Sequence, residues 1–262
     1  MNTTPDLSII IPTCNRAPHL ERLLAAIWNG VDCSYEIIVV DGASDDGTPS
    51  VLAHAKKSLG DALTIIREQC REGFVRAANR GFRAARGRNV TWCNDDARPL
   101  ESALDNAVAQ LDDADDRVGM LAMFHHNDAS KNVALERAHR GQPYKLMHVR
   151  GTLYANFGIA RRETWERLDY FDERFFLYGA DPDFSLKVWH AGLRVEPAWM
   201  SFIDHDEHAD ERRVTDFDRG RRDNETLFAK WDLPPKNLER NDFDPVRPCT
   251  LRGLRQPINA AA

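Results

Sequence analysis

The first 124 residues alternate between short apolar runs and longer stretches whose apolar residues recur at helical spacing. The apolar runs, predicted to be strands, cover residues 7–11, 36–40, 63–66, 89–93 and 118–124. Four helices are predicted between them: one that begins near residue 18, one that includes residues 51–52, one at 74–85 and one at 100–111. Strands that alternate with helices form a parallel sheet with right-handed crossovers. The sequence therefore predicts an α/β fold with a doubly wound, mostly parallel sheet flanked by helices.

The second half of the chain is less regular. Residues 125–150 are polar without a clear period, so we expect them to form a loop over the site. The remaining elements are predicted as strands at 151–159 and 198–203, and as helices at 162–168, 183–191 and 216–231. Residues 233–262 are rich in Pro, Arg and Asp and are expected to form a tail. We therefore expect one domain over residues 1–232, with halves 1–124 and 125–232.

Composition excludes several classes of protein. The formal charge of −6 argues against a general affinity for nucleic acid. No apolar run is long enough for a transmembrane helix, and residues 1–6 lack the features of a signal peptide. The five cysteines are scattered without a CxxC pair, which predicts neither a zinc site nor disulfides and favours a cytoplasmic location. The arginines of the tail allow peripheral contact with an anionic membrane, and a solvated tail is the alternative.

Polar clusters fall where such a sheet binds ligands, at the carboxyl ends of its strands. They lie at residues 12–16, 41–44, 94–96 and 179–183. The cluster Asn94-Asp95-Asp96 is the most informative, because carboxylates are costly to bury without a partner. Carboxylates in this position commonly hold a metal ion or a sugar ring. The alternative is a polar loop in which Asp96 caps the next helix.

Short motifs at these strand ends follow one another in a characteristic order. They are SIIIPTCNR at 8–16, EIIVVDG at 36–42, DDGT at 45–48, the stretch 73–87, NDD at 94–96, FDERFFLYGADPD at 171–183, AGLRV at 191–195 and His205. This ordered set resembles family 2 of the glycosyltransferases over about residues 7–208. The resemblance implies the GT-A fold and an inverting transfer of a sugar from a nucleotide-sugar.

The chain departs from the family's pattern at three positions. Ala180 replaces the acidic residue that usually precedes the catalytic Asp, and Gly42 stands where many members carry a second Asp. Asn94 replaces the first Asp of the metal motif, as in the rhamnosyltransferase-like branch. The change at Ala180 bears on acceptor recognition, and the change at Asn94 leaves fewer charges for a metal.

The resemblance implies a divalent metal ion, Mn²⁺ or Mg²⁺, that neutralises the departing nucleoside diphosphate. Asp96 matches the family's metal ligand, His205 is the candidate second ligand, and His208 is the fallback. Carboxylate plus imidazole suits Mn²⁺, whereas Mg²⁺ prefers oxygen ligands. An ordinary surface histidine is the alternative for His205, because residues 204–208 are very polar.

The resemblance also implies a set of residues that bind the nucleotide. Asp41 matches the carboxylate that accepts a hydrogen bond from the nucleobase. The others implied are Thr13 and Arg16 beside the nucleotide, and Asn94 and Asp95 at ribose or base edges. Arg71 is expected to approach the nucleotide, with a solvated arginine as the alternative.

An inverting displacement needs a base that takes the proton of the acceptor hydroxyl. Asp181 matches the family's catalytic Asp, and Asp183 is the alternative base. Either carboxylate is also a candidate cap for the following helix. Asp172 and Glu173 either contact the acceptor or pair with Arg174 or Arg161.

We therefore expect an inverting, metal-assisted glycosyltransferase that uses a UDP-, dTDP- or GDP-sugar. The expected acceptor is a glycan, a lipid-linked sugar or a small molecule. A nucleotidyltransferase or a Rossmann dehydrogenase would need a glycine-rich loop at residues 12–16, which contain no glycine. The rival hypothesis is a non-catalytic protein that binds nucleotide-sugars or glycans on a degenerate transferase scaffold.

Overall fold

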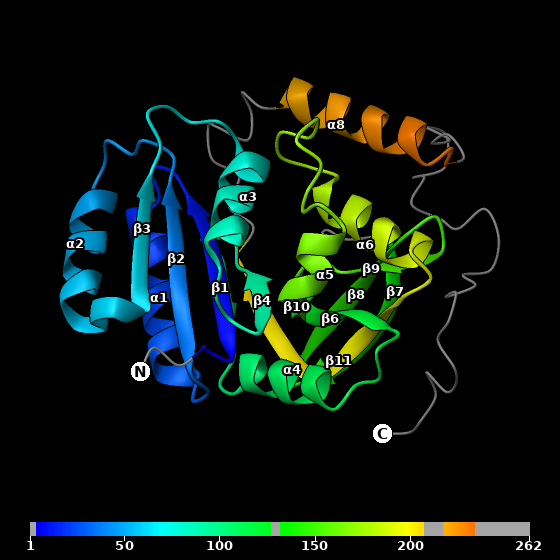
Figure 1. Ribbon diagram of the computed structural model, residues 1–262, viewed down its shortest axis with the longest axis horizontal. Helices are drawn as coiled ribbons and strands as arrows, with labels where there is room; N and C mark the ends of the chain where they lie inside the picture. The colour runs from blue at the N-terminus through cyan, green and yellow to red at the C-terminus, as the bar shows by residue number, and fades with distance from the viewer. Residues whose placement is uncertain (1–3, 127–131, 207–216, 234–262) are drawn as a thin grey trace.

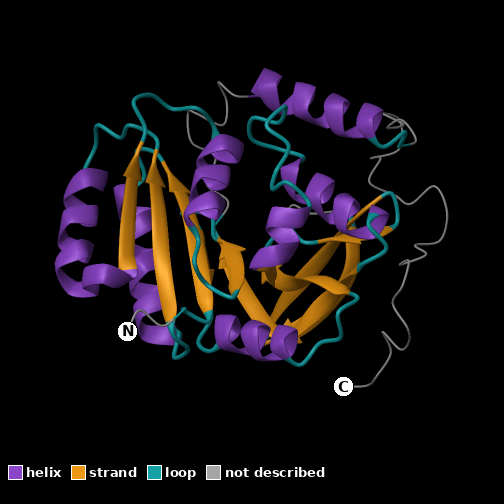
Figure 2. Cartoon of the chain, in the orientation of Figure 1, coloured by secondary structure: helices purple, strands orange, loops and turns teal. Residues whose placement is uncertain are grey.

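The computed structural model describes residues 4–126, 132–206 and 217–233. Its strands form one sheet of 11 strands, and helices cover both faces (Figures 1 and 2). The elements of the first half are β1 (Leu7–Thr13), α1 (Ala17–Gly30), β2 (Tyr35–Asp41), α2 (Thr48–Leu59), η1 (Gly60–Ala62), β3 (Leu63–Arg67), α3 (Phe74–Ala84), β4 (Asn89–Trp92), β5 (Ala97–Pro99), α4 (Ala103–Asp112) and β6 (Val118–His126). The mostly parallel α/β sheet expected from the sequence is confirmed.

Four parallel strands in the order β3-β2-β1-β4 carry the first polar clusters. Every residue of β1 is buried, as expected for a central parallel strand covered on both faces. Thr13 at the end of β1 pairs with Asp41 at the end of β2, which pairs with Arg67 at the end of β3. This register places the carboxyl ends of the three strands at one edge, at the top of Figure 1.

The second half adds strands to the same sheet. Its elements are β7 (Val133–His139), β8 (Gln142–Val149), β9 (Thr152–Tyr154), β10 (Gly158–Arg161), α5 (Arg162–Arg167), α6 (Ala180–His190), β11 (Arg194–His205) and α8 (Phe217–Lys230). Antiparallel β10 joins β4 to β6, and β11 runs parallel to β6. The three-residue strand β5 lies antiparallel to β11 and pairs Ala97 with His205. The cluster at 94–96 is thereby placed beside the end of β11.

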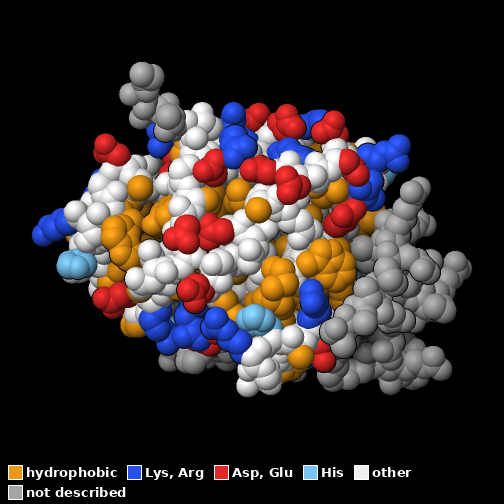
Figure 3. Space-filling model, turned by 90° about the horizontal axis from the view of Figure 1, so that it is seen from below, with side chains coloured by type: hydrophobic (Ala, Val, Ile, Leu, Met, Phe, Trp, Pro, Cys, Tyr) orange, Lys and Arg blue, Asp and Glu red, His pale blue; other side chains and the backbone are white. Residues whose placement is uncertain are grey.

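Two hydrophobic layers cover the faces of the sheet. Ile9 and Ile11 of β1 pack on one face against α1, α2 and α4. Ile10 points to the other face, where side chains of α3, α5, α6 and α8 form the second layer. Figure 3 views the molecule from below, on the side of α4, where acidic, basic and apolar side chains are interspersed. Among the described residues, no helix combines the length and apolar character needed to cross a bilayer.

The expectation of a loop over residues 125–150 was wrong. Within the described part of this stretch, β7 and β8 form an antiparallel hairpin that joins the sheet through β6. Arg140 and Gly141, at its turn, both have positive φ, the backbone that two-residue hairpins favour. Most residues of β7 are half-buried, so its polar side chains do not alternate clearly with apolar ones and the period was obscured.

Three other element boundaries differ from the expectations. The strand predicted at 151–159 is two strands, β9 and β10, and that predicted at 198–203 is the longer β11. Helix α6 begins at Ala180, three residues before the predicted start, and its N-terminal cap is Gly179. Neither candidate acidic residue, Asp181 or Asp183, is therefore its cap. The division of residues 1–232 into halves remains a prediction, and all but the first residue of the predicted tail lies outside the described residues.

Candidate functional site

A cavity of about 340 Å³ opens at the carboxyl ends of β1 and β4, between α3 and α6. Eight of the nine candidate residues line it: Thr13, Arg16, Arg71, Asn94, Asp95, Asp96, Asp181 and His205. They come from both halves of the chain, so the sheet brings the predicted clusters together. Asp41 is the exception and does not line the cavity.

The floor of the cavity is an ion-paired cluster from β1, the start of α1 and the loop after β4. Arg16 Nη1 lies 3.1 Å from Asp95 Oδ1 and 2.7 Å from Asp96 Oδ2. Thr13 donates a hydrogen bond of 2.9 Å from Oγ1 to Asp95 Oδ2. Both carboxylates are buried, and one guanidinium therefore balances two negative charges.

The two adjacent carboxylates have opposite pKa shifts. Burial raises the pKa of Asp95 to about 6; the negative charge of Asp96 acts in the same direction, while Arg16 and Thr13 oppose it. Burial also acts to raise the pKa of Asp96, but His205 and Arg16 outweigh it, and this pKa lies well below its ordinary value. Asp96 is consequently the carboxylate that stays ionised over the whole neutral range.

Asp96 and His205 face each other across the β5–β11 pair. Asp96 Oδ1 lies 3.2 Å from His205 Nε2, and His205 is only 8% exposed. Neither ring nitrogen of His205 makes a hydrogen bond to another described residue. The alternative of an ordinary surface histidine is therefore wrong. His208, the fallback ligand, lies outside the described residues.

These two side chains fit a divalent metal ion. An ionised carboxylate oxygen and an imidazole nitrogen without a hydrogen bond form a mixed donor pair of the kind that suits Mn²⁺. The described residues contain no group of three or more His, Cys, Asp or Glu side chains placed to hold a metal. Substrate oxygens and water are suitable further ligands. The alternative of Asp96 as a helix cap is wrong, because β5 intervenes and Ser102 precedes α4.

Near the ends of β2 and β3 the cavity is lined by an acidic residue, Glu68, that the sequence reasoning missed. Asp41 is 1% exposed, and its carboxylate accepts a hydrogen bond of 3.0 Å from the backbone of Ser44. Its neighbour Gly42 lines the cavity, as does Glu68 after β3. Glu68 pairs with Arg80 of α3 and accepts a hydrogen bond from the backbone of Glu72. A carboxylate directly after a strand was the available signal for Glu68.

Arg71 is exposed on the cavity rim but is not simply solvated. Its guanidinium carbon lies 5.5 Å from the centroid of the Phe176 ring, within the range of a cation–π contact. Gly73 allows this approach of the two segments, because a Cβ atom there would lie 2.7 Å from the same ring. Arg71 is thereby held at the cavity it lines.

Asp181 enters the cavity from the first turn of α6. Its pKa is raised to about 7 by burial, with its backbone hydrogen bond and the charge of His205 opposing the shift. Asp183 does not line the cavity. It is fully buried and pairs with Lys230 at 2.7 Å and with Trp231 Nε1 at 2.7 Å. The geometry therefore favours Asp181 over Asp183 as a base.

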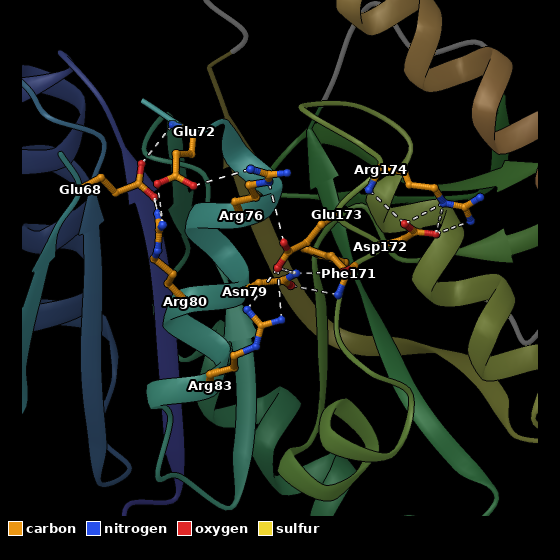
Figure 4. A network of polar contacts seen from close by, with 10 residues as sticks. All are labelled: Glu68, Glu72, Arg76, Asn79, Arg80, Arg83, Phe171, Asp172, Glu173 and Arg174. Carbon is orange, nitrogen blue, oxygen red and sulfur yellow. Dashed lines mark hydrogen bonds and ion pairs between the residues drawn. The ribbon is translucent and has the colours of Figure 1, made fainter. Parts of the chain in front are cut away.

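The segment before Asp181 is tied to α3, as Figure 4 shows. Asn79 donates to the carbonyl oxygen of Phe171 at 2.9 Å and accepts from its N–H at 3.0 Å. Glu173 lies within 3.2 Å of Arg83, and Asp172 lies 2.6 Å from Arg174. Asp172 thus pairs with Arg174, one of the two arginines named as alternatives, whereas Glu173 pairs with Arg83, which was not named. Arg161, the other named arginine, instead binds backbone carbonyls.

Two half-buried residues of the second half also line the cavity without having been predicted. Tyr154 ends β9, and Asn156 follows it. Asn156 Nδ2 lies 3.4 Å from Nε2 of His125, a buried histidine whose ring centroid is 6.4 Å from that of His205. Burial lowers the pKa of His125 to about 3, so this ring is neutral. No motif signalled these residues, because they fall in the stretch with the least regular pattern.

Comparison with known proteins places this geometry in a family. Residues 8–185 match the family described as Glycosyl transferase family 2. The chain is 32% identical over 109 residues to a GalNAc(5)-diNAcBac-PP-undecaprenol beta-1,3-glucosyltransferase of Campylobacter jejuni, covering 42% of this chain and 35% of that protein. It is 30% identical over 112 residues to glycosyltransferase AglE of Haloferax volcanii, covering 42% and 36%. The chain thus matches about a third of the length of these relatives.

Solved structures agree with the family match. The mannosyltransferase PcManGT from Pyrobaculum calidifontis, in complex with GDP-Man and Mn²⁺, has a TM-score of 0.67 and 26% identity, covering 91% of this chain and 67% of that one. GalNAc-T7, with UDP, GalNAc and Mn²⁺, has a TM-score of 0.62 at 16% identity, covering 79% and 44%, and supports the fold alone. With its mostly parallel sheet, its polar cavity at the strand ends and these matches, the chain belongs to family 2 of the glycosyltransferases and has the GT-A fold.

Proposed function

We propose that the protein is an inverting glycosyltransferase that moves a sugar from a nucleoside-diphosphate sugar to a hydroxyl group. The observation that carries this proposal is the composition of one cavity. The pair Asp96 and His205 and the single carboxylate Asp181 line it together, although they come from distant parts of the chain. A transferase of this kind needs both an anion-stabilising group for the leaving diphosphate and a base for the acceptor.

Asp96 and His205 are the residues that would hold a divalent metal ion, and their mixed donor set favours Mn²⁺ over Mg²⁺. When bound, the ion supplies positive charge that neutralises the leaving diphosphate. Arg16 keeps Asp95 and Asp96 in place with contacts of 3.1 and 2.7 Å. PcManGT, whose structure contains GDP-Man and Mn²⁺, supports this assignment.

The nucleotide would lie along the carboxyl ends of β1 to β4. Thr13 and Arg16 are proposed beside the nucleotide, Asn94 and Asp95 at ribose or base edges, and Arg71 on the rim. Asp41 remains the proposed partner of the nucleobase, although it is covered in this structure. Gly42 and Glu68 line the cavity whereas Asp41 does not, so contact with Asp41 would require a shift of the segments around them. UDP-, dTDP- and GDP-sugars are the proposed donors.

Asp181 is the proposed base. Its carboxylate takes the proton of the acceptor hydroxyl while the hydroxyl oxygen forms a bond to the anomeric carbon and the bond to the diphosphate oxygen breaks. Attack on the face opposite the leaving group inverts the anomeric centre. A pKa of about 7 matches a base that works near neutral pH.

The acceptor is proposed to be a glycan, a lipid-linked sugar or a small molecule. The Campylobacter jejuni relative, whose name includes undecaprenol diphosphate, favours a lipid-linked acceptor. A cytoplasmic location, with peripheral contact at the inner face of a membrane, remains a prediction. So does membership of the rhamnosyltransferase-like branch.

The rival proposal is a protein that binds the nucleotide-sugar without transferring the sugar. Ala180, Gly42 and Asn94 favour it, because each removes a carboxylate that many relatives carry. The joint placement of Asp96, His205 and Asp181 in one cavity favours the enzyme.

Turnover separates the two proposals. Purified protein is incubated with UDP-glucose or GDP-mannose, Mn²⁺ and a panel of acceptors, and release of the nucleoside diphosphate is measured. We expect wild-type turnover and a loss of about 10³-fold in kcat for Asp181→Asn. The control Asp116→Asn changes an exposed carboxylate on the loop before β6 and is expected to leave kcat unchanged. Nucleotide binding without turnover by the wild type would favour the rival.

A further inference from the structure

The helix α8 binds the segment that precedes Asp181 through one buried side chain. Asp223 is 4% exposed, and its carboxylate accepts hydrogen bonds from three consecutive backbone N–H groups. The donors are Phe176 at 3.0 Å, Leu177 at 2.8 Å and Tyr178 at 2.9 Å. Buried N–H groups require partners, and hydrogen bonds to an ionised carboxylate are stronger than those to neutral acceptors. Asp223 therefore fixes the backbone of these three residues.

A second contact of α8 holds the other side of Asp181. Lys230 Nζ lies 2.8 Å from Asp172 and 2.7 Å from Asp183, and the adjacent Trp231 donates a hydrogen bond to Asp183. Asp172 and Asp183 lie on either side of Asp181 in the sequence. The helix α8, which crosses above α6 in Figure 1, consequently contacts the chain on both sides of Asp181.

The residues that Asp223 holds are part of the cavity wall. Leu177, Tyr178 and Gly179 line the cavity together with Asp181, and Asn224 of α8 lines it as well. Gly179 turns the chain into α6 with φ of 81°, so the backbone at residues 176–178 determines where the first turn of α6 begins.

Other elements leave this stretch without regular pairing. Residues 168–179, between α5 and α6, form no helix or strand. From α3, Asn79 bonds Phe171 and Glu173, and the N–H of Val75 donates a long hydrogen bond of 3.4 Å to the carbonyl oxygen of Phe176. The family match ends at residue 185, so α8 lies outside it. The position of Asp181 thus depends on an element that the family comparison does not include.

We propose that Asp223 is a positioning residue for the transfer reaction: by holding residues 176–178, it sets the place of Asp181 in the cavity. This inference rests on the proposed function of Asp181. Asp223 does not line the cavity and acts only through the backbone it binds.

The test compares Asp223→Asn with Asp218→Asn. Both make the same change on α8, but the side chain of Asp218 is 79% exposed, and among the described residues its ion pair is with Arg221 at 3.6 Å. The new amide NH₂ at position 223 would face backbone donors, so the three hydrogen bonds cannot all be kept. Asp223→Glu keeps the charge and both acceptor oxygens and serves as the conservative variant.

Three measurements are made on each variant of the 262-residue chain, together with its melting temperature. The first is kcat and KM for release of the nucleoside diphosphate from UDP-glucose or GDP-mannose with Mn²⁺. The second is the Kd of UDP and GDP with Mn²⁺. The third is the pKa of the Asp181 carboxyl group, measured from the NMR shift of its carboxyl carbon. The signal is assigned by its absence in Asp181→Asn.

We expect Asp223→Asn to lower kcat about 100-fold while the nucleotide Kd changes by less than about twofold. The pKa of Asp181 is expected to move from its raised value toward about 4, because a loosened segment admits water. Asp223→Glu is expected to recover part of kcat, and Asp218→Asn to match the wild type.

A wild-type kcat in Asp223→Asn would overturn the positioning role. A joint fall of kcat, nucleotide affinity and melting temperature in this variant would overturn it as well. If the wild type turns over neither donor, the proposed function fails. The Asp181 titration then still decides on Asp223: a pKa unchanged by Asp223→Asn overturns the inference, and a shift toward the ordinary value supports it.

Discussion

Asp181 and Asp183 stand two positions apart in α6 and have opposite surroundings. Asp183 forms an ion pair with Lys230 and accepts a hydrogen bond from Trp231, away from the cavity. The pKa of Asp181, in contrast, is raised to about 7 by burial. The same helix turn thus separates a structural carboxylate from one that can exchange a proton with a substrate.

The raised pKa of Asp181 predicts two pH dependences. Transfer requires the ionised carboxylate, so the rate rises with pH up to about 7 and then levels off. Stability changes in the opposite direction. The folded state holds this proton more tightly than the unfolded chain, whose carboxyl pKa is about 4, so stability falls as the pH rises from about 4 to about 7.

Urea unfolding at about pH 5 and about pH 8 tests the stability dependence in wild type and Asp181→Asn. The wild type should lose more stability between the two than the variant, by a difference on the order of a few kcal/mol. Equal pH dependence in the two proteins would show that the carboxyl group is not perturbed.

Most candidate residues could be predicted because each lies directly after a strand or in a recognisable motif. Thr13 and Asp96 belong to this group, and the parallel register brings their loops together. The positions of His125 and Asn156 near the cavity could not be predicted, because they depend on how β6, β9 and β10 pack. Burial of Asp41 away from the cavity lining is likewise a property of packing that no motif encodes.

At the scale of the elements, the contact between α3 and the segment before Asp181 depends on Asn79. The amide of Asn79 bonds both the N–H and the carbonyl oxygen of Phe171, as a neighbouring strand would in a sheet. Asn79→Ala leaves both groups without a partner in the interior and is expected to destabilise the protein by about 2–4 kcal/mol.

Chemical denaturation measures this cost against Asn29→Ala. Asn29 is exposed, and within the described part of the chain its side chain bonds the carbonyl oxygen of Ala25 in α1, so its loss should cost less than about 0.5 kcal/mol. Similar costs for the two variants would contradict the anchoring role of Asn79.

Long elements with one buried face could be predicted, and short or half-exposed ones could not. The stripe Leu20, Leu23, Leu24 and Ile27 identifies α1 because all four side chains enter the core. The hairpin β7–β8 has no comparable face, and β5 has only three residues. Helix α6 begins early because Gly179, rather than an acidic cap, turns the chain into it.

At the scale of the whole molecule, one sheet connects the two predicted halves. β10 bonds to β4 on one side and to β6 on the other, and both hydrophobic layers contain residues from before and after residue 124. We therefore expect a single cooperative unfolding transition. Differential scanning calorimetry and circular dichroism should give the same midpoint. Two separated transitions would show that the halves fold independently.

The parallel strands of the first half could be predicted from the alternation of strands and helices. The strands that complete the sheet could not. The order β4-β10-β6-β11-β5 mixes orientations and includes strands of three and four residues. These strands are specified by long-range pairing, such as Ala97 with His205, more than by local pattern. That pairing is what brings the proposed metal ligands together.

The measurement that tests the central claim most directly is a calorimetric titration with UDP, GDP and dTDP, each with and without Mn²⁺. Wild type is compared with Asp96→Ala and with Asp116→Ala, which removes an exposed carboxylate. The account predicts that one nucleotide binds with a Kd of about 1–100 μM, and that binding needs both Mn²⁺ and Asp96. Binding that ignores both would remove the metal from the mechanism. Absence of binding by all three nucleotides would contradict the assignment of this cavity as a donor site.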